Sequence, residues 1–132
     1  MKRTLQQDVD WVYIIDEHKE VLISGKLTSV RGSITLFPRH MPAYRRSPEN
    51  AWGVIGYEAF PSLGRARLTI LVIIPQARGQ GFGMKLVEFA ERRLKIYDIT
   101  EVAGTRMLEE AEGFWEKMGY TVTGDIIRKR LR

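Results

Sequence analysis

Residues 68–90 read LTILVIIPQARGQGFGMKLVEFA, and this stretch decides the fold. A β-rich apolar segment ends at Pro75, glycines follow at positions 79, 81 and 83, and a helical pattern continues to Tyr97. Its apolar positions 82, 86, 89, 90, 94 and 97 share one helix face. A helix that starts after a glycine turn presents unpaired backbone N–H groups and the positive end of its dipole. The sequence therefore predicts a strand, an anion-binding turn and a helix in succession.

Two common nucleotide motifs do not fit this turn. A Walker loop needs G-x-x-x-x-G-K-[ST], which the sequence lacks. A dinucleotide fingerprint needs G-x-G-x-x-G, whereas here the last glycine comes one residue too early, and too little chain follows for two βαβ halves. A glycine-rich connector that binds nothing remains the alternative to a ligand site.

Apolar runs and turn residues place further elements on both sides of this stretch. The unbroken apolar run 70–74 predicts a central strand that is covered on both faces. Gly113 falls inside a predicted helix, where it would cost about 1 kcal/mol against alanine unless a ligand or strand passes closely. The expected elements are an antiparallel hairpin of 52–60 and 66–74, a helix over 83–97, a strand at 99–103, a helix over 106–118, and a hairpin of 120–123 and 126–131.

The first fifty residues follow a less regular pattern. Residues 1–8 are polar and predict a loose segment or a short helix, and a strand is expected at 9–15. The charged residues 16–20 predict a turn, and further strands are expected over 27–37. Three prolines exclude a regular helix or central strand at 38–50, which is expected to be a surface loop, either a substrate loop or a plain connector.

Composition sets the protein class. A length of 132 residues with 44% apolar and 28% charged residues predicts one globular domain, 1–132. The order of the expected elements, with strands in groups and two helices in the second half, predicts a mixed α/β (α+β) class with a mostly antiparallel twisted sheet and helices packed on it. No apolar run approaches the ~20 residues of a membrane span, and the N-terminal residues lack a signal-peptide core. A cytoplasmic protein is therefore expected. The chain has no cysteine, and its two histidines lie far apart, so no metal site is expected.

The net charge of +5 leaves several kinds of partner open. A basic domain attracts nucleic acid, an acidic surface or a phosphorylated cofactor, and the charge also aids solubility. Basic residues gather at 39–46 and 128–132. No recognised DNA- or RNA-binding motif is present, so nucleic acid is an improbable partner.

Two segments carry a family resemblance. Arg78-x-x-Gly81-x-Gly83, directly after the apolar strand, resembles the acetyl-CoA signature Q/R-x-x-G-x-G/A of the GNAT superfamily of N-acetyltransferases. Residues 111–120, AEGFWEKMGY, resemble the family's A-x-x-F-Y-x-K-x-G-F/Y segment. The resemblance covers residues 52–128, whereas 1–50 is atypical and lacks the family's usual pair of N-terminal helices.

The resemblance implies a site for acetyl-CoA. Backbone groups of residues 71–73 would pair with the pantetheine arm as an added strand, and N–H groups of residues 78–84 would hold the pyrophosphate. The strands at 68–74 and 99–103 would splay apart to admit the arm. The implied acetyl-CoA residues are Leu71, Val72, Ile73, Arg78, Gly79, Gln80, Gly81, Phe82, Gly83, Met84 and Trp115.

The family's usual polar catalytic residues are replaced in this chain. Trp115, Leu108 and Ala103 stand where the family often has tyrosine, asparagine and glutamate. Glu101 lies two residues before Ala103 and so faces the same side of its strand. Glu101 and Glu58 are therefore candidate bases and Tyr120 a candidate proton donor.

The resulting hypothesis is an N-acetyltransferase that moves an acetyl group from acetyl-CoA to a primary amine on a small molecule or a protein. The alternative is a non-catalytic acyl-CoA sensor or interaction module, because the three polar catalytic residues are missing. An exposed strand edge would also allow a homodimer.

Overall fold

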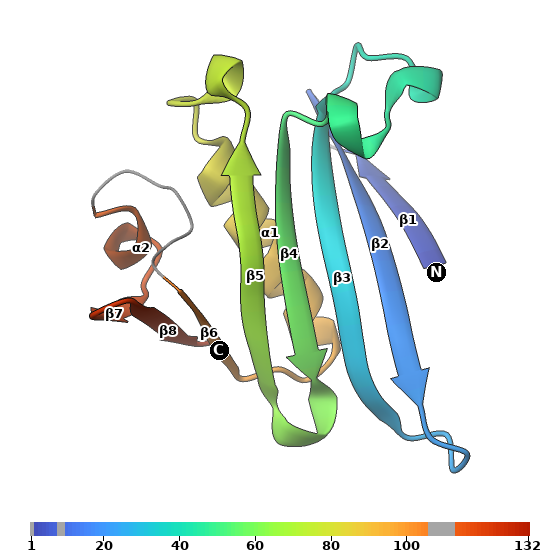
Figure 1. Cartoon of the computed structure of the whole chain (residues 1–132), viewed down its shortest axis with the longest axis vertical. Helices are drawn as coiled ribbons and strands as arrows, with labels where there is room; N and C mark the ends of the chain where they lie inside the picture. Colours follow the sequence, from blue (N-terminus) through green and yellow to red (C-terminus); the bar gives the residue numbers. More distant parts are fainter. Residues whose placement is uncertain (1, 8–9, 106–112) are drawn as a thin grey trace.

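The computed structural model describes residues 2–7, 10–105 and 113–132, which form one sheet in the strand order β1-β2-β3-β4-β5-β6-β8-β7 (Figure 1). Its strands are β1 (Lys2–Gln7), β2 (Trp11–Val21), β3 (Leu27–Pro38), β4 (Gly53–Phe60), β5 (Arg65–Ile73), β6 (Glu101–Thr105), β7 (Thr121–Thr123) and β8 (Ile126–Arg130). Only β5 and β6 pair in parallel among these strands. The predicted mixed, mostly antiparallel fold is confirmed.

Helix α1 (Phe82–Ile96) covers one face of the sheet, which we call the back face. Figure 1 shows α1 behind β4 and β5, and its buried Leu86, Val87, Ala90 and Leu94 belong to the main core. Among the described residues, those that cover the opposite, front face lie at one end of it, where Ala51 and Met41 of the loop after β3 pack on β2 and β3. In the described part of the chain, no helix crosses the front of β4 and β5.

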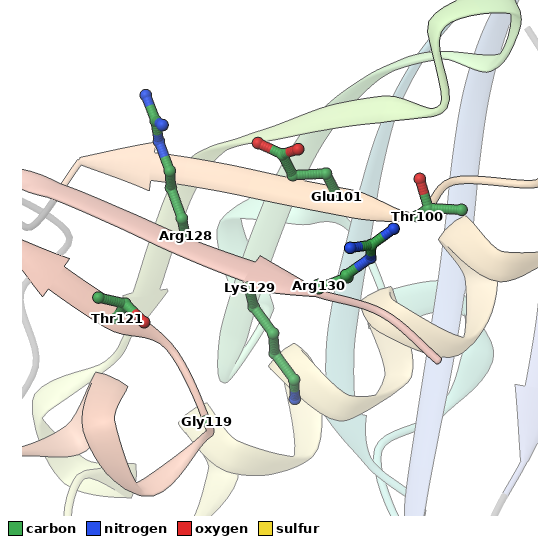
Figure 2. A pocket seen from close by; sticks show the side chains of 7 residues that line it. All are labelled: Thr100, Glu101, Gly119, Thr121, Arg128, Lys129 and Arg130. Atoms are coloured by element: carbon green, nitrogen blue, oxygen red, sulfur yellow. The ribbon is translucent and has the colours of Figure 1, made fainter.

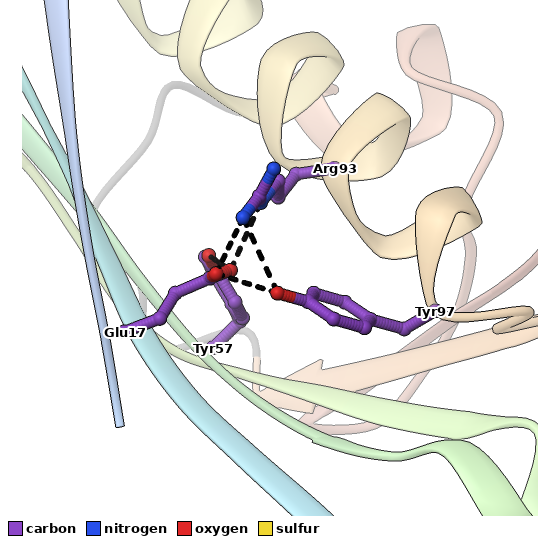
Figure 3. A network of polar contacts seen from close by, with 4 residues as sticks. All are labelled: Glu17, Tyr57, Arg93 and Tyr97. Carbon is purple, nitrogen blue, oxygen red and sulfur yellow. Dashed lines mark hydrogen bonds and ion pairs between the residues drawn. The ribbon is translucent and has the colours of Figure 1, made fainter. Parts of the chain in front are cut away.

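A buried carboxylate fixes α1 to the sheet (Figure 3). Glu17 of β2 is 2% exposed and accepts hydrogen bonds from Tyr57 of β4, Tyr97 and Arg93. Burial alone would raise the pKa of Glu17, but the bonds from Arg93, Tyr57 and Tyr97 outweigh it and lower that pKa to about 2. The network therefore joins α1, the helix that follows the glycine turn, to strands β2 and β4.

The predictions for the first fifty residues need correction. β2 continues through 16–20, where a charged turn was expected, and the chain turns instead at Leu22–Lys26. The strand tolerates these charges because His18 and Glu20 are exposed, whereas Glu17 faces the back and is satisfied there. Residues 2–7 form a strand, not a loose segment or a helix. The expected loop at 38–50 is confirmed and contains two short 3-10 turns.

Three predictions in the second half also change. The run at 70–74 is not covered on both faces, since Ile70 and Val72 are 42% and 44% exposed on the open front face. β6 starts two residues later than expected. Of the helix expected over 106–118, residues 106–112 lie outside the described residues, and α2 spans Phe114–Lys117. Gly113 caps α2 with a φ of +82°, so its backbone conformation explains the glycine without a passing ligand.

Candidate active site

Strands β5 and β6 separate after a short region of pairing. Arg65, Ala66 and Arg67 pair with Glu101–Ala103, and beyond Arg67 no described strand pairs with this edge of β5 (Figure 1). The other edge stays paired with β4 as far as Ile73. Residues 68–73, ~20 Å of strand, therefore present an edge that no described strand covers, although the Ile73 carbonyl at its end accepts a hydrogen bond from Arg78. The predicted splay is present, and the predicted residues Leu71, Val72 and Ile73 lie along it.

A bulge lies at the mouth of this splay. Gly56 of β4 pairs with Ile70, whereas the next residue, Tyr57, pairs with Leu68, so Thr69 has no partner on β4. A Cβ on Gly56 would lie 2.5 Å from Thr69 Oγ1, so the glycine makes room for this side chain. Sequence reasoning did not identify Thr69 as a site residue. The available signal was Gly56 itself, since a glycine inside a strand often marks a bulge.

The glycine turn leaves backbone N–H groups free at the end of β5. Gly79 and Gly81 have φ of +78° and +82°, and a Cβ added at either would meet no atom within 4 Å. The Lys85 N–H donates to the Gly81 carbonyl at 3.2 Å, and no side chain caps the helix. Because this is the first bond of α1, the preceding helical amides of Phe82, Gly83 and Met84 have no partner within the helix. These amides and the helix dipole are features that favour an anion, and they follow β5 in the chain.

The side chains of the turn shape it. Arg78 Nε donates to the Ile73 carbonyl at 3.0 Å, and Gln80 Nε2 donates to the Gln76 carbonyl at 3.3 Å. The Phe82 ring is buried against Trp11 and Trp52, with centroid distances of 4.6 and 5.8 Å. Two polar side chains of the turn are thus bonded to the turn's own backbone, and its one aromatic ring is buried.

Trp115 provides an unpartnered donor. It is 4% exposed, and its Nε1 is buried without a hydrogen-bond partner in the described part of the chain. Its ring lies edge-on to Phe114 and Tyr120, with centroid distances of 5.0 and 5.1 Å. A buried donor without an acceptor costs about 1–3 kcal/mol, so this N–H fits a site where a ligand supplies the acceptor. The amides and open glycines of the turn, for their part, are compatible with the pyrophosphate of an acyl-CoA.

Tyr120 lies in the core and does not face the open side of the sheet. It is 3% exposed, and its hydroxyl donates to Glu91 of α1 at 2.8 Å. Burial, and then the charge and hydrogen bond of Glu91, raise the pKa of Tyr120. Lys129 donates to the same carboxylate at 2.9 Å. The Tyr120 hydroxyl thus joins α1 to the segment directly before β7 (Thr121–Thr123).

Glu58 and Glu101 lie on neighbouring rungs below the splay. Glu58 accepts a hydrogen bond from Arg67 across the β4–β5 pair at 2.8 Å, and its side chain is 23% exposed. Glu101 pairs in register with Arg65, two residues further from the splay. The two predicted bases therefore come from different strands, β4 and β6. Both lie beside the half of β5 that is away from the glycine turn.

Further limits apply to the described residues. They contain no group of three or more histidine, aspartate or glutamate residues placed to hold a metal ion. Among them, no helix combines the length and apolar character needed to cross a membrane.

A sheet that opens beside a parallel strand, with a bare helix N-terminus at the end of the gap, defines a fold of the acetyltransferase class. Residues 42–122 match the family model described as an acetyltransferase (GNAT) domain. The chain belongs to this family. No curated protein matches the sequence.

Solved structures share the fold at low sequence identity. An acetyltransferase from Bacillus cereus aligns with 16% identity and a TM-score of 0.60, over 78% of this chain and 74% of that one. A GNAT-family acetyltransferase from Staphylococcus aureus aligns with 14% identity and a TM-score of 0.59, over 77% and 68%. N-acetylglutamate synthase from Neisseria gonorrhoeae, complexed with coenzyme A and N-acetylglutamate, aligns with 13% identity and a TM-score of 0.58, over 76% of this chain and 26% of that one. At these identities the likeness concerns the fold alone.

Proposed function

We propose that this protein transfers an acetyl group from acetyl-CoA to a primary amine. The observation that carries the proposal is the continuity of two backbone features. The free edge of β5 at 68–73 leads directly into the uncapped turn at 78–84. One feature suits an extended amide-bearing chain, and the other suits a pyrophosphate.

Different residues of the site would contact different parts of acetyl-CoA. Backbone groups of Leu71, Val72 and Ile73 would pair with the pantetheine amides, and the amides from Gly79 to Met84 would hold the pyrophosphate. The indole N–H of Trp115 would donate to an oxygen or sulfur atom near the acyl end. Bound acetyl-CoA supplies an activated acyl group as a thioester.

The acceptor amine would approach from the front face, which no described helix covers. The amine must lose a proton in order to be acylated, and correct positioning of the amine against the thioester supplies much of the rate. Glu58 lies on that face, one rung below the Thr69 bulge, and Glu101 lies lower on the same face. We assign the base to these carboxylates, acting directly or through water. Tyr120 would have to release Glu91 before it could donate a proton to the site.

Calorimetry with acetyl-CoA tests the proposal, and two glycines provide a matched pair of variants. Gly81 and Gly124 both have positive φ and both have open space where a Cβ would lie. Gly124 lies in the β7–β8 turn, far from the glycine turn at 78–84, which we call the cradle. Valine at either position strains the backbone in the same way, so only a ligand at the cradle distinguishes them.

We expect Gly81→Val to weaken acetyl-CoA binding at least tenfold relative to Gly124→Val, because it crowds the amides that face the pyrophosphate and misdirects them. No binding by the unaltered protein at millimolar acetyl-CoA would refute the proposal.

A non-catalytic acyl-CoA-binding module is the second candidate. The bond between Tyr120 and Glu91 favours it, as does an indole in place of the family's usual tyrosine. Thiol release measured across a panel of amines separates the two functions. Tight acetyl-CoA binding without turnover of any amine would support the binding module.

A further inference from the structure

We propose that the amine acceptor carries an anionic group, a carboxylate or a phosphate, and that four arginines on the front face bind this group. The inference rests on the proposed function, since it names the class of acceptor. The four residues, called here the arginine patch, are Arg65, Arg67, Arg128 and Arg130.

Strand register brings these arginines together from distant parts of the chain. Arg67 and Arg128 lie on either side of Ala103, and Arg65 and Arg130 lie on either side of Glu101. The spacing of strands separates the two Cα atoms of each rung by ~10 Å, and the two rungs by ~7 Å. All four residues are exposed. They share the front face, because the alternate residues of β5 and β8, among them Ala66 and Ile127, are buried toward the back.

Positive charge on the patch exceeds the negative charge beside it. Arg67 is paired with Glu58 at 2.8 Å, but Arg65, Arg128 and Arg130 form no ion pair with any residue that the structure describes. Among the residues that the structure describes, four guanidinium groups therefore share this face with two carboxylates, those of Glu58 and Glu101, which gives these six side chains a net charge of +2.

The neighbouring Lys129 shows the contrast. Figure 2 shows its side chain on the other side of β8 from Arg128. There it donates to Glu91 at 2.9 Å and to the Met118 carbonyl at 2.8 Å. The basic residue that faces the back is thus neutralised, whereas the arginines on either side of it in sequence keep free donors for a ligand.

A cavity beside β8, lined by Arg128 and Arg130 of the patch and also by Gly119 and Lys129, offers space for the anionic group. Its volume is about 360 Å³, within the range of small-molecule sites. Arg128 and Glu101 rise from the same side of their strands beside it, and Thr100 and Thr121 supply hydroxyl groups (Figure 2). The residues that line it are Thr100, Glu101, Gly119, Thr121, Arg128, Lys129 and Arg130.

The position of the patch relative to the splay connects it to acyl transfer. The rung of Arg67 and Arg128 is the last one before β5 and β6 separate. An anion bound there by Arg67 and Arg128 would leave the amine of a short acceptor, such as β-alanine or O-phosphoethanolamine, on the splay side of this rung, toward Glu58 and the Thr69 bulge. The acceptor class is therefore a short molecule or side chain that bears both groups.

The second arginine cluster of the sequence is used differently. In the loop after β3, Arg46 donates through Nε to the Met41 carbonyl at 2.9 Å and through an Nη to the Arg39 carbonyl at 3.1 Å. This guanidinium holds the loop together. Arg45 of the same loop is exposed, and the loop lies at the opposite end of β4 and β5 from Arg65 and Arg67, so Arg45 provides a control with the same change of charge.

The test follows the arginine Nε–Hε resonances by NMR in the absence of acetyl-CoA. The phosphate probe is O-phosphoethanolamine, the carboxylate probe is β-alanine, and ethanolamine is the neutral reference. We expect saturable shifts of Arg128 and Arg130 with at least one anionic probe and none with ethanolamine. Arg128→Gln should weaken that probe's binding by about ten- to a hundredfold, as expected for a lost charged hydrogen bond, whereas Arg45→Gln should leave it unchanged.

Turnover with acetyl-CoA provides the second reading. The KM of the preferred anionic amine should rise at least tenfold in Arg128→Gln, while the turnover of ethanolamine stays the same. Equal losses in Arg45→Gln, turnover of ethanolamine as efficient as that of the anionic amines, or shifts produced only by a single-stranded oligonucleotide would overturn the proposal. If acetyl-CoA fails to bind but the resonances shift, the proposed function and the acceptor assignment fall, and an anion site remains.

Discussion

Replacing Glu17 with glutamine tests whether the buried carboxylate fixes α1 to the sheet. The side chain is 2% exposed and accepts bonds from three partners, Tyr57, Arg93 and Tyr97 (Figure 3). Glutamine keeps the shape, but it removes the charge opposite Arg93 and turns an NH₂ group toward donors. Breaking a buried pair from one side costs ~3–5 kcal/mol. The Arg93 side chain is 19% exposed, so water can still solvate part of its charge. We therefore expect the free energy of unfolding to fall by ~3 kcal/mol, at the low end of that range.

The pH dependence gives an independent value for the same interaction. A fall of the Glu17 pKa from 4.5 to about 2 corresponds to ~3 kcal/mol, since each pH unit is worth ~1.4 kcal/mol. The folded-state pKa is the lower one, so this stabilisation is complete above pH 4.5 and is lost as the pH falls from about 4.5 toward 2. The difference in stability between the unaltered protein and Glu17→Gln should therefore be full at pH 7 and shrink across that window.

Urea unfolding followed by circular dichroism at pH 7, 5, 4 and 3 measures both effects. Glu88→Gln is the control, since Glu88 is an exposed residue of α1 and should change the free energy of unfolding by less than ~0.5 kcal/mol. Other carboxylates titrate in all three proteins, so their contributions cancel in the differences. A Glu17→Gln loss at pH 7 no larger than that of the control, or one that stays constant down to pH 3, would refute this account of the network.

Two further predictions concern the acyl end of the site. Trp115→Phe removes a donor that has no partner among the described residues, so it should cost less than ~1.5 kcal/mol of stability, as expected for a hydrophobic exchange that conserves most of the volume, and raise the KM for acetyl-CoA several-fold. Thermal unfolding and steady-state kinetics on the same samples check this, and an unchanged KM would count against the indole as a ligand contact. Gly56→Ala places a Cβ 2.5 Å from Thr69 Oγ1 and 2.8 Å from Ile70 Cγ2, so it should distort the bulge and lower kcat at least tenfold. Acetyl-CoA affinity measured by calorimetry should change less than kcat, because the glycine turn is untouched, and an unchanged kcat would remove the bulge from the mechanism.

The parts of the fold that sequence predicted are those set by neighbouring residues. The apolar strand, the glycines at 79–83 and the helical pattern after them lie within thirty residues of one another, and all three elements are confirmed. The path of β2 depended on distant residues. The charges at 16–20 read as a turn, because nothing near Glu17 in sequence shows that Arg93, 76 residues away, satisfies its carboxylate. The exposure of Ile70 and Val72 was also hidden, because it depends on what does not cover the front face.

The same distinction divides the candidate site. The proposed acyl-CoA site uses backbone groups of one continuous segment, so its glycine spacing is visible in sequence and tolerates varied side chains around it. An acceptor site must instead use side chains to recognise its ligand, and here those side chains come from strands 63 residues apart, as Arg65 and Arg128 do. Only the pairing register of β5, β6 and β8 shows that these side chains are neighbours on one face of the sheet. A family that keeps its acyl donor by backbone contacts is free to change the residues at the mouth of the splay. The open front face and its arginine patch are therefore where we expect this chain to differ most from relatives that share its fold.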